Sequence, residues 1–553
     1  MAEKNNGKNS FIAQAGILAA AGIISRIIGL LYRSPMHAVI GDLGFGYYSS
    51  AYNYYTIILL ISSYSIPSAI SKVIAQKLAV KEYRNAHRIF LCALGYVLVV
   101  GGVAGLFLFF GAGLFVSGEA IPVLRTFAPT VFVYGILGVL RGYFQAHKSM
   151  AQTSVSQILE QIANAVVSVG AAYLLIKSVM GTMEVPADEA GQVTRATHGA
   201  IGSAMGTGAG VLVALLFMLG MYGLNKNIIH GRIRRDRHTN VEPYSNILKT
   251  ITMVVTPFIL STAVYNLSST VNNDIYTKRF PAIRGISSVE IYSRWSGFSQ
   301  ALTISNIPIA FASAIAAAII PSVAQLVAAR DEEGTRETIG LAVKTTMLLS
   351  IPCAVGLFVL ARPVTSLLFP SNTQEGENLA TALLMALALS VVFYALSTLN
   401  SQALQGLGRL NMPIINAGIA LAVQSVTAVG LLFFTDLDLY SIAIANTVYS
   451  GVMCLLNQRA VRRASGYRQE VIRTFLVPAL ASAFMGAAAW AVYEGLLMLT
   501  RSPKISVVIA ILLGACVYFI MLLLFRGVNE QELRSFPKGY LLVRLAKKMR
   551  LLG

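Results

Sequence analysis

Several polar side chains lie inside long apolar stretches of this sequence, where they could bind a ligand away from water. Arg26 lies in the apolar stretch that starts near Phe11. A stretch of about 20 residues spans a bilayer, and a cation near its centre costs about 2.5–3.5 kcal/mol. An anionic ligand or a water-filled cavity would offset that cost. Alternatively, the Arg26 side chain reaches the outer interface near Tyr32 and Arg33, and the pattern leaves both interpretations open.

A second group of polar residues follows helical spacing. It consists of Gln157, Glu160, Gln161, Asn164 and Ser168. Because these residues recur every three or four positions, they share one face of a helix. A polar stripe on a membrane helix either lines a cavity or makes hydrogen bonds to neighbouring helices, and the sequence does not decide between the two.

Further candidates lie in the second and eighth apolar stretches. Tyr47 and Tyr48 begin the second stretch and are typical of an interfacial aromatic belt, which explains Asn53 less well. The predicted substrate-binding residues of a central cavity are Arg26, Arg33, Asn53, Glu160, Asn164, Arg294 and Gln300. Cations dominate this set, and guanidinium groups bind phosphate through paired hydrogen bonds, so we expect an anionic ligand.

The sequence contains no motif for catalysis or for nucleotide or metal binding. HExxH, Walker A and Gly-x-Ser-x-Gly are absent, and the four cysteines lack metal-ligand spacing. We therefore expect no enzyme activity, no cofactor, no metal ion and no nucleotide. A membrane enzyme acting on polyprenyl lipids would need grouped carboxylates, and the nearest group, Asp331 to Glu333, is interpreted as a solvated loop. Gly202, Gly206 and Gly210 predict close helix packing rather than a phosphate loop.

Composition places the chain in a membrane. Mean hydropathy is +0.66 and only 12% of residues are charged, which excludes an ordinary soluble protein. The pattern predicts an all-α polytopic fold with about fourteen spans. Lys and Arg, among them Arg141 and Lys148, collect in alternate loops, which predicts cytoplasmic N and C termini. We therefore assign the net charge of +19 to contact with anionic lipid headgroups rather than nucleic acid.

The two halves of the sequence share an internal repeat. Ile66-Pro67-Ser68 returns as Ile320-Pro321-Ser322, and Val131, Tyr134 and Gln145 return as Val391, Tyr394 and Gln405. We predict two related six-helix lobes, the usual frame of an alternating-access transporter. The predicted organisation is an N-terminal lobe at 1–224, a basic cytoplasmic linker at 225–249, a C-terminal lobe at 250–458, two additional helices at 459–526 and a basic amphipathic cytoplasmic tail at 527–553.

The order of these motifs resembles the multidrug/oligosaccharidyl-lipid/polysaccharide (MOP) exporter superfamily. The residues that carry the resemblance are Ser25 to Gly29 in the first span, Ile66 to Ser68 after the second and Phe144 to Ala146 after the fourth. Within the superfamily the chain is similar to the MurJ-type lipid II flippases and the stage V sporulation protein B group of Gram-positive bacteria. The resemblance maps the family's essential first-helix arginine onto Arg26, with Arg33 and Arg294 as looser counterparts.

The resemblance implies transport of an undecaprenyl-pyrophosphate-linked peptidoglycan precursor from the inner to the outer leaflet of a bacterial plasma membrane. Two other transport functions stay open. The first is a flippase for another lipid-linked polysaccharide, such as a teichoic acid or capsule unit. The second is a cation-coupled multidrug exporter, which needs intramembrane carboxylates, and Glu160 is the main candidate. Because the second half offers no carboxylate for a sodium site, membrane potential alone could drive transport.

Overall fold

The computed structural model describes residues 21–22, 24–64, 66–147, 149–236, 241–370, 373–530, 540, 543–544 and 547, which form helices joined by turns and short irregular segments. No strand occurs in these ranges. Packing divides the chain into two compact units, residues 1–296 and 297–553. The predicted lobe boundaries at 224 and 250 stay predictions, since the repeat and the packing divide the chain by different criteria.

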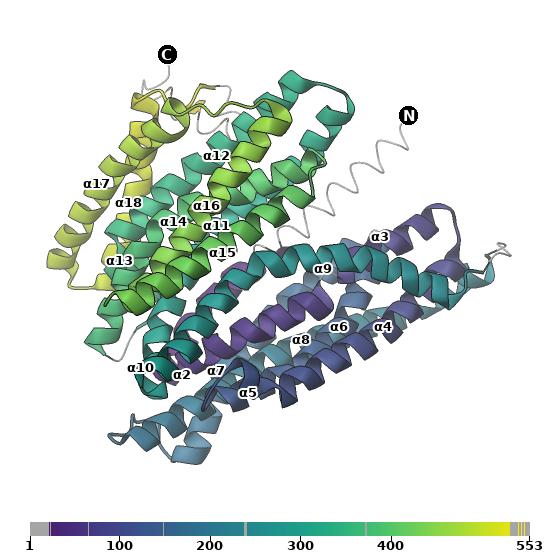
Figure 1. The fold of residues 1–553 in the computed structure, drawn as a ribbon, viewed down its shortest axis with the longest axis horizontal. Helices are drawn as coiled ribbons and strands as arrows, with labels where there is room; N and C mark the ends of the chain where they lie inside the picture. The colour runs from purple at the N-terminus through teal and green to yellow at the C-terminus, as the bar shows by residue number, and fades with distance from the viewer. Residues whose placement is uncertain are drawn as a thin grey trace. The chain divides into compact units, whose positions relative to one another are not determined.

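Unit 1 is built from helices that follow a helical stretch beginning at Ile24 (Figure 1). They are α2 (Arg33–Leu59), the π-helical turn η1 (Leu60–Tyr64), α3 (Ile66–Ala79), α4 (Tyr83–Phe110), α5 (Ala112–Phe115), α6 (Ala120–Ala146), α7 (Met150–Met180), α8 (Glu189–Arg234), α9 (Tyr244–Asp274), η2 (Ile275–Arg279) and α10 (Phe280–Arg284). The following helix, α11 (Ser288–Ala328), begins in unit 1 and continues into unit 2.

Unit 2 continues with the helices drawn from green to yellow in Figure 1. They are α12 (Glu332–Val359), α13 (Ala361–Leu368), α14 (Gln374–Gly406), α15 (Asn411–Phe434), α16 (Leu439–Ser465), η3 (Ile472–Leu476), α17 (Val477–Thr500) and α18 (Pro503–Leu524). Most of the predicted tail, 527–553, lies outside the described residues. Of its described members, Val543 is buried against Leu522 and Leu523, and Lys547 pairs with Glu530 at 2.9 Å.

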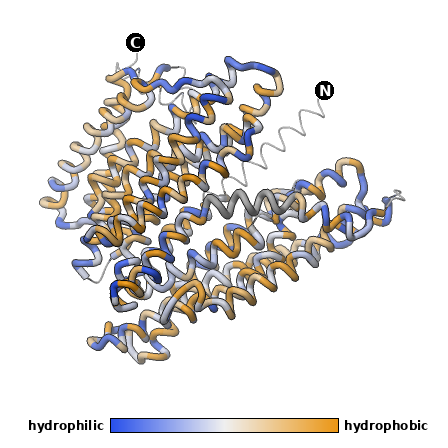
Figure 2. Tube along the Cα trace, viewed as in Figure 1, coloured by the Kyte–Doolittle hydropathy of each residue, from blue (hydrophilic) through white to orange (hydrophobic). Residues whose placement is uncertain are grey.

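Eleven helical segments of the described chain are long and apolar enough to cross a membrane. One of them, Ile24–Ala79, has 56 residues, and its helical geometry breaks at Gly41, where φ is 71°. Figure 2 shows hydrophobic residues along the helices and hydrophilic residues at many of the turns. The all-α polytopic prediction is thus confirmed, while the count of fourteen and the position of the termini stay predictions.

One face of α4 exposes a row of large apolar side chains. Val99, Val103, Leu106 and Phe110 are between 60 and 75% exposed. Their spacing of three or four residues places them on one side of the helix. A row of bare apolar side chains on one helix face suits contact with lipid tails and not with water.

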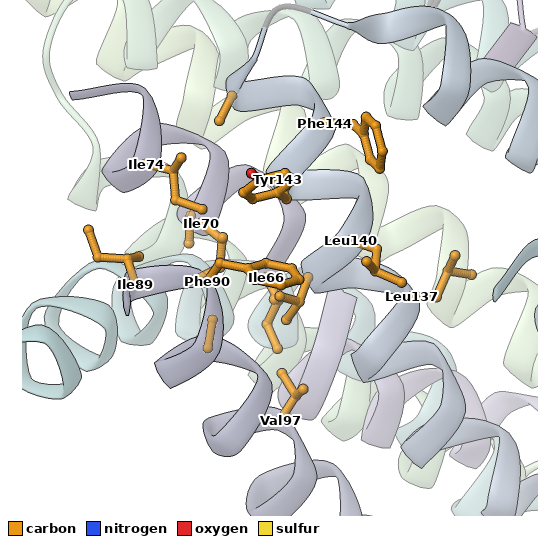
Figure 3. Close-up of a cluster of buried hydrophobic side chains, with 14 of the residues drawn as sticks. Ile66, Ile70, Ile74, Ile89, Phe90, Val97, Leu137, Leu140, Tyr143 and Phe144 are labelled. Carbon is orange, nitrogen blue, oxygen red and sulfur yellow. The ribbon is translucent and has the colours of Figure 1, made fainter. Parts of the chain in front are cut away.

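In each unit, a glycine near the second repeated motif lies close to the Ile-Pro-Ser helix. In unit 1, α3 lies against α6 in a buried cluster that includes Ile66, Ile70 and Leu140 (Figure 3). A side chain at Gly142 of α6 would come within 2.7 Å of the Pro67 carbonyl oxygen. In unit 2, a side chain at Gly406 of α14 would come within 3.1 Å of the Ile320 carbonyl oxygen of α11. A glycine thus lets the Ile-Pro-Ser helix approach its neighbour closely in each unit.

The segment predicted as a basic linker is anchored to unit 1 at both of its described ends. Asp236 accepts a hydrogen bond from the Arg84 backbone amide at 2.8 Å. The Glu242 carboxylate pairs with Lys77, and its backbone amide donates to Asn85 at 3.0 Å. Within the predicted linker, 225–249, α8 continues to Arg234 and α9 begins at Tyr244. Asp236 and Glu242 therefore attach this segment to α3 and α4.

The three glycines spaced four apart bring α8 against α7, as their spacing predicted. A Cβ atom at Gly202 would lie 2.5 Å from the Ala172 backbone nitrogen, and one at Gly206 would lie 2.4 Å from that of Ser168. Backbone atoms cannot move aside as a flexible side chain can. The two helices therefore touch backbone to backbone along this row.

We predict that Gly206→Ala destabilises the protein, because the added methyl group forces α8 away from α7. Overpacking of this kind costs about 1–3 kcal/mol, which thermal unfolding of the purified protein in detergent would detect. Gly220→Ala on the same helix is the matched control, since nothing lies within 4 Å of its Cβ position. Equal melting temperatures for the two variants would contradict the close packing.

Candidate functional site

The first helix of the candidate site runs from Ile24 to the break at Gly41. Across the break, Nε2 of His37 lies 3.0 Å from Oδ1 of Asp42. Arg195 of α8 donates to the Val39 carbonyl at 2.8 Å. A glycine at the break takes a positive φ without steric cost, and the freed backbone oxygen finds a donor within the protein. The turn is thus fixed in place, and with it the helix that carries Arg26 and Arg33.

Arg26 and Arg33 share one face of this helix. They are seven residues apart, which is two helical turns or about 10 Å. The backbone hydrogen bonds from Tyr32 to Ile28 and from Met36 to Tyr32 keep the helix continuous around Arg33. The Arg26 side chain is exposed and that of Arg33 is partly buried. The two guanidinium groups therefore form a row along the helix.

The helix that carries this row lies beside the predicted polar stripe of α7. A side chain at Gly29, which lies between the two arginines, would come within 3.3 Å of Oε1 of Gln161. Nδ2 of Asn164 donates to the Tyr32 hydroxyl at 3.4 Å. Both contacts join residues 132 positions apart, so the two helices run parallel. The structure thus brings Arg26, Arg33, Glu160 and Asn164 into one region of unit 1.

Glu160 forms a buried ion pair that the sequence did not predict. Its Oε2 atom accepts from the Arg141 guanidinium of α6 at 2.7 Å, and Nε of Arg141 donates to Ser156 at 2.9 Å. The side chains are 5% exposed for Arg141 and 15% for Glu160. The assignment of Arg141 to a basic loop was wrong. The available signal was Glu160 itself, since a carboxylate inside a membrane requires a cationic partner on a neighbouring helix.

The remaining stripe residues bind neighbouring helices as well as one another. The Ser168 hydroxyl lies 2.8 Å from Oδ1 of Asn164 and 3.0 Å from the Ser203 carbonyl of α8. Of the two interpretations of the stripe, interhelical hydrogen bonding therefore describes Asn164 and Ser168. Glu160 combines an interhelical contact with a partly exposed carboxylate.

Asn53 lies in a different polar contact, between α2 and α9. It accepts from the Ser269 hydroxyl at 2.9 Å, and Ser50 donates to Asn273 at 3.1 Å nearby. The adjacent residue, Tyr52, instead lies beside Arg33, whose Cζ is 5.9 Å from the ring centroid. Neighbouring residues point about 100° apart around a helix, so α2 presents Asn53 to α9 and Tyr52 to the arginine row.

The tyrosines at the start of the second span are not an aromatic belt. Tyr47 and Tyr48 are 1% and 2% exposed, whereas a belt residue reaches the membrane interface. Tyr47 packs edge-on against Tyr292 of α11, and Tyr48 packs against Phe127 of α6. The belt prediction was therefore wrong for both residues, which form part of the core of unit 1.

The two predicted residues from the eighth span lie in different units. Arg294 belongs to unit 1 and forms an ion pair at 2.8 Å with Glu290, one turn earlier on α11. Gln300 belongs to unit 2 and is buried. In the described chain, no group of three or more His, Cys, Asp or Glu side chains could hold a metal ion.

The buried ion pair generates a stability prediction. Glu160→Ala would leave the Arg141 charge buried without a partner, which costs about 3–5 kcal/mol. The double variant Arg141→Met/Glu160→Met should regain most of the loss in melting temperature. The exposed pair Arg362–Glu377, with Nε 3.3 Å from Oε1, provides the control Glu377→Ala, which should cost less than about 1 kcal/mol. Similar losses for the two alanine variants would rule out the proposed burial effect.

Comparison with known proteins gives one consistent family. The family model described as "Lipid II flippase MurJ" matches residues 90–512. The lipid II flippase MurJ of Bacillus subtilis (strain 168) is 24% identical over 495 residues, covering 85% of this chain and 86% of the relative. Stage V sporulation protein B of the same organism is 23% identical over 553 residues, covering 97% of this chain and 100% of the relative.

Solved structures share the fold. A lipid II flippase MurJ in an inward closed conformation aligns with a TM-score of 0.62 at 16% identity, over 91% of this chain and 97% of the other. An inward-facing multidrug resistance MATE transporter of the MOP superfamily aligns with a TM-score of 0.63 at 18% identity, over 80% and 96%. The expected resemblance is thus confirmed. This multi-pass membrane protein belongs to the lipid II flippase MurJ family.

Proposed function

We propose that this protein moves a polyprenyl-diphosphate-linked peptidoglycan precursor, lipid II, from the inner to the outer leaflet of a bacterial plasma membrane. Family membership supports the flippase function, and the B. subtilis relative that matches most of both chains supports this cargo. Membrane potential would act directly on the net charge carried through the membrane, without a bound nucleotide or cofactor.

The observation that carries the proposal is the row of two arginines on the first helix of unit 1. Glu160 neutralises Arg141 within their buried pair. The first helix adds two further guanidinium groups, those of Arg26 and Arg33. Both belong to the arginine row, where the side chains are exposed or partly exposed. A diphosphate offers a negative charge on each of its two phosphoryl groups, and guanidinium groups bind phosphate oxygens in pairs.

A flippase for another lipid-linked glycan is the second candidate. The match to stage V sporulation protein B extends over 97% of this chain, including terminal regions that lie outside residues 90–512. The same arginine row would serve either cargo, because both carry the diphosphate. The cargo assignment therefore depends on a direct measurement with the glycan attached.

We predict that Arg26→Ala lowers transport by about 10- to 100-fold, the factor expected when charged hydrogen bonds worth about 1.5–3 kcal/mol are lost. The test is to deplete the resident lipid II flippase of a bacterial host, express each variant and measure lipid II accessible on the outer leaflet. Arg125→Ala is the control, because Arg125 is an exposed arginine of a spanning helix whose Nε donates to the Phe109 carbonyl.

Two outcomes would change the proposal. Wild-type levels of outer lipid II with a normally inserted Arg26→Ala protein would remove Arg26 from the site. If the inserted wild-type chain restores no lipid II exposure but does expose another lipid-linked glycan in its own host, the second candidate replaces the first.

A further inference from the structure

The Tyr52 ring of unit 1 is partly exposed and lies near an arginine and a glutamate. Tyr52 is partly exposed, whereas the rings packed around it, Tyr48, Tyr55 and Phe127, are at most 2% exposed. Arg33 lies over the Tyr52 ring. Glu160 lies on α7 next to Gln161, whose Oε1 is 3.3 Å from the Cβ position of Gly29 on the helix that leads to Arg33. We call Arg33, Tyr52 and Glu160 the Tyr52 patch.

The buried rings hold Tyr52 in a fixed orientation. Tyr48 stacks on it with centroids 5.7 Å apart and planes 15° apart. Phe127 approaches at 5.8 Å and 64°, and Tyr55 at 5.7 Å and 47°. A ring supported by three aromatic neighbours loses little further freedom when a ligand packs on it, and such pre-organisation favours binding.

Arg33 lies near the distance limit of a cation–π interaction with this ring. Its Cζ lies 5.9 Å from the centroid, close to the limit of about 6 Å for a cation–π interaction. A phosphate offers the guanidinium a stronger, charge-assisted partner. Turning toward a phosphate would uncover the ring face while keeping Arg33 beside it.

Glu160 retains acceptor capacity in the pair with Arg141. A carboxylate has about four lone-pair positions on its two oxygens, and Arg141 donates to Oε2. The pair fixes the position of Glu160, whose side chain is 15% exposed. An ionised carboxylate accepts hydrogen bonds from hydroxyl groups that are about twice as strong as neutral ones.

We propose that the Tyr52 patch is a subsite for the sugar directly attached to a lipid diphosphate, an inference that rests on the proposed function. Arg33 binds the phosphate next to the sugar. The C–H groups on one side of the pyranose ring pack on the face of Tyr52, and a sugar hydroxyl donates to Glu160. Apolar contact plus a few fixed polar groups is the usual composition of a small-ligand site. Arg141 and Ser156 are positioning residues that hold Glu160.

The experiment compares two lipids that differ only in the sugar. Full-length protein in vesicles is titrated with a polyprenyl diphosphate and with the same lipid carrying one N-acetylhexosamine, and both dissociation constants are measured. We expect wild type to bind the glycosylated lipid about tenfold more tightly. Tyr52→Leu should reduce that ratio to about one and leave the affinity for the sugar-free lipid within about twofold. Tyr52→Phe, which keeps the ring, should retain most of the preference.

Tyr173→Leu is the matched control. Tyr173 is 41% exposed on α7, with Nζ of Lys177 6.0 Å from its ring centroid, so it is a partly exposed tyrosine next to a cation outside the Tyr52 patch. This variant should behave as wild type. Should Tyr52→Leu not fold, Tyr52→Trp gives a second measurement. The chain contains two tryptophans, and the new indole should change emission with the glycosylated lipid only.

The outcomes separate the two proposals. Equal wild-type affinity for both lipids, or an unchanged preference in Tyr52→Leu, overturns the sugar subsite and leaves the flippase function intact. A Tyr52→Trp emission that responds equally to both lipids does the same. Failure of the wild-type protein to bind either lipid would count against both the subsite and the proposed function.

Discussion

The ion pair between Arg141 and Glu160 is the interaction on which the polar region of unit 1 depends. Hydrocarbon does not solvate a lone carboxylate, so α7 can carry Glu160 only because α6 presents a guanidinium 2.7 Å away. The pair joins α6 to α7 beside the helix that carries Arg26 and Arg33.

Single helices of unit 1 also carry two kinds of polar residue on different sides. One kind bonds to neighbouring helices, and the other lies in the candidate site. On α2, Asn53 bonds to α9 while Tyr52 lies beside Arg33. On α7, Ser168 bonds to α8 while Glu160 stays partly exposed. Polar contacts between helices are specific in direction, and this specificity fixes which face of each helix is left for other contacts. The same residues thus hold the bundle together and orient the candidate site.

The sequence predicted the features that depend on a single helix. Hydropathy and spacing identified the helical membrane fold, the shared face of the α7 stripe and the glycine row of α8. The errors concern partners on other helices. Arg141 belongs to the core because Glu160 lies opposite, and Tyr47 is buried because Tyr292 covers it. Spacing tells which residues share a face, but it does not tell which helix that face meets.

The glycine row has a consequence for how this protein can change over generations. A side chain at Gly210 would come within 2.5 Å of the carbonyl oxygen of Glu160 itself. The backbone at Glu160 can therefore lie this close to α8 only because residue 210 has no side chain. We expect these two positions to be inherited together, so that a lineage which alters residue 210 also gives up or relocates the carboxylate at 160.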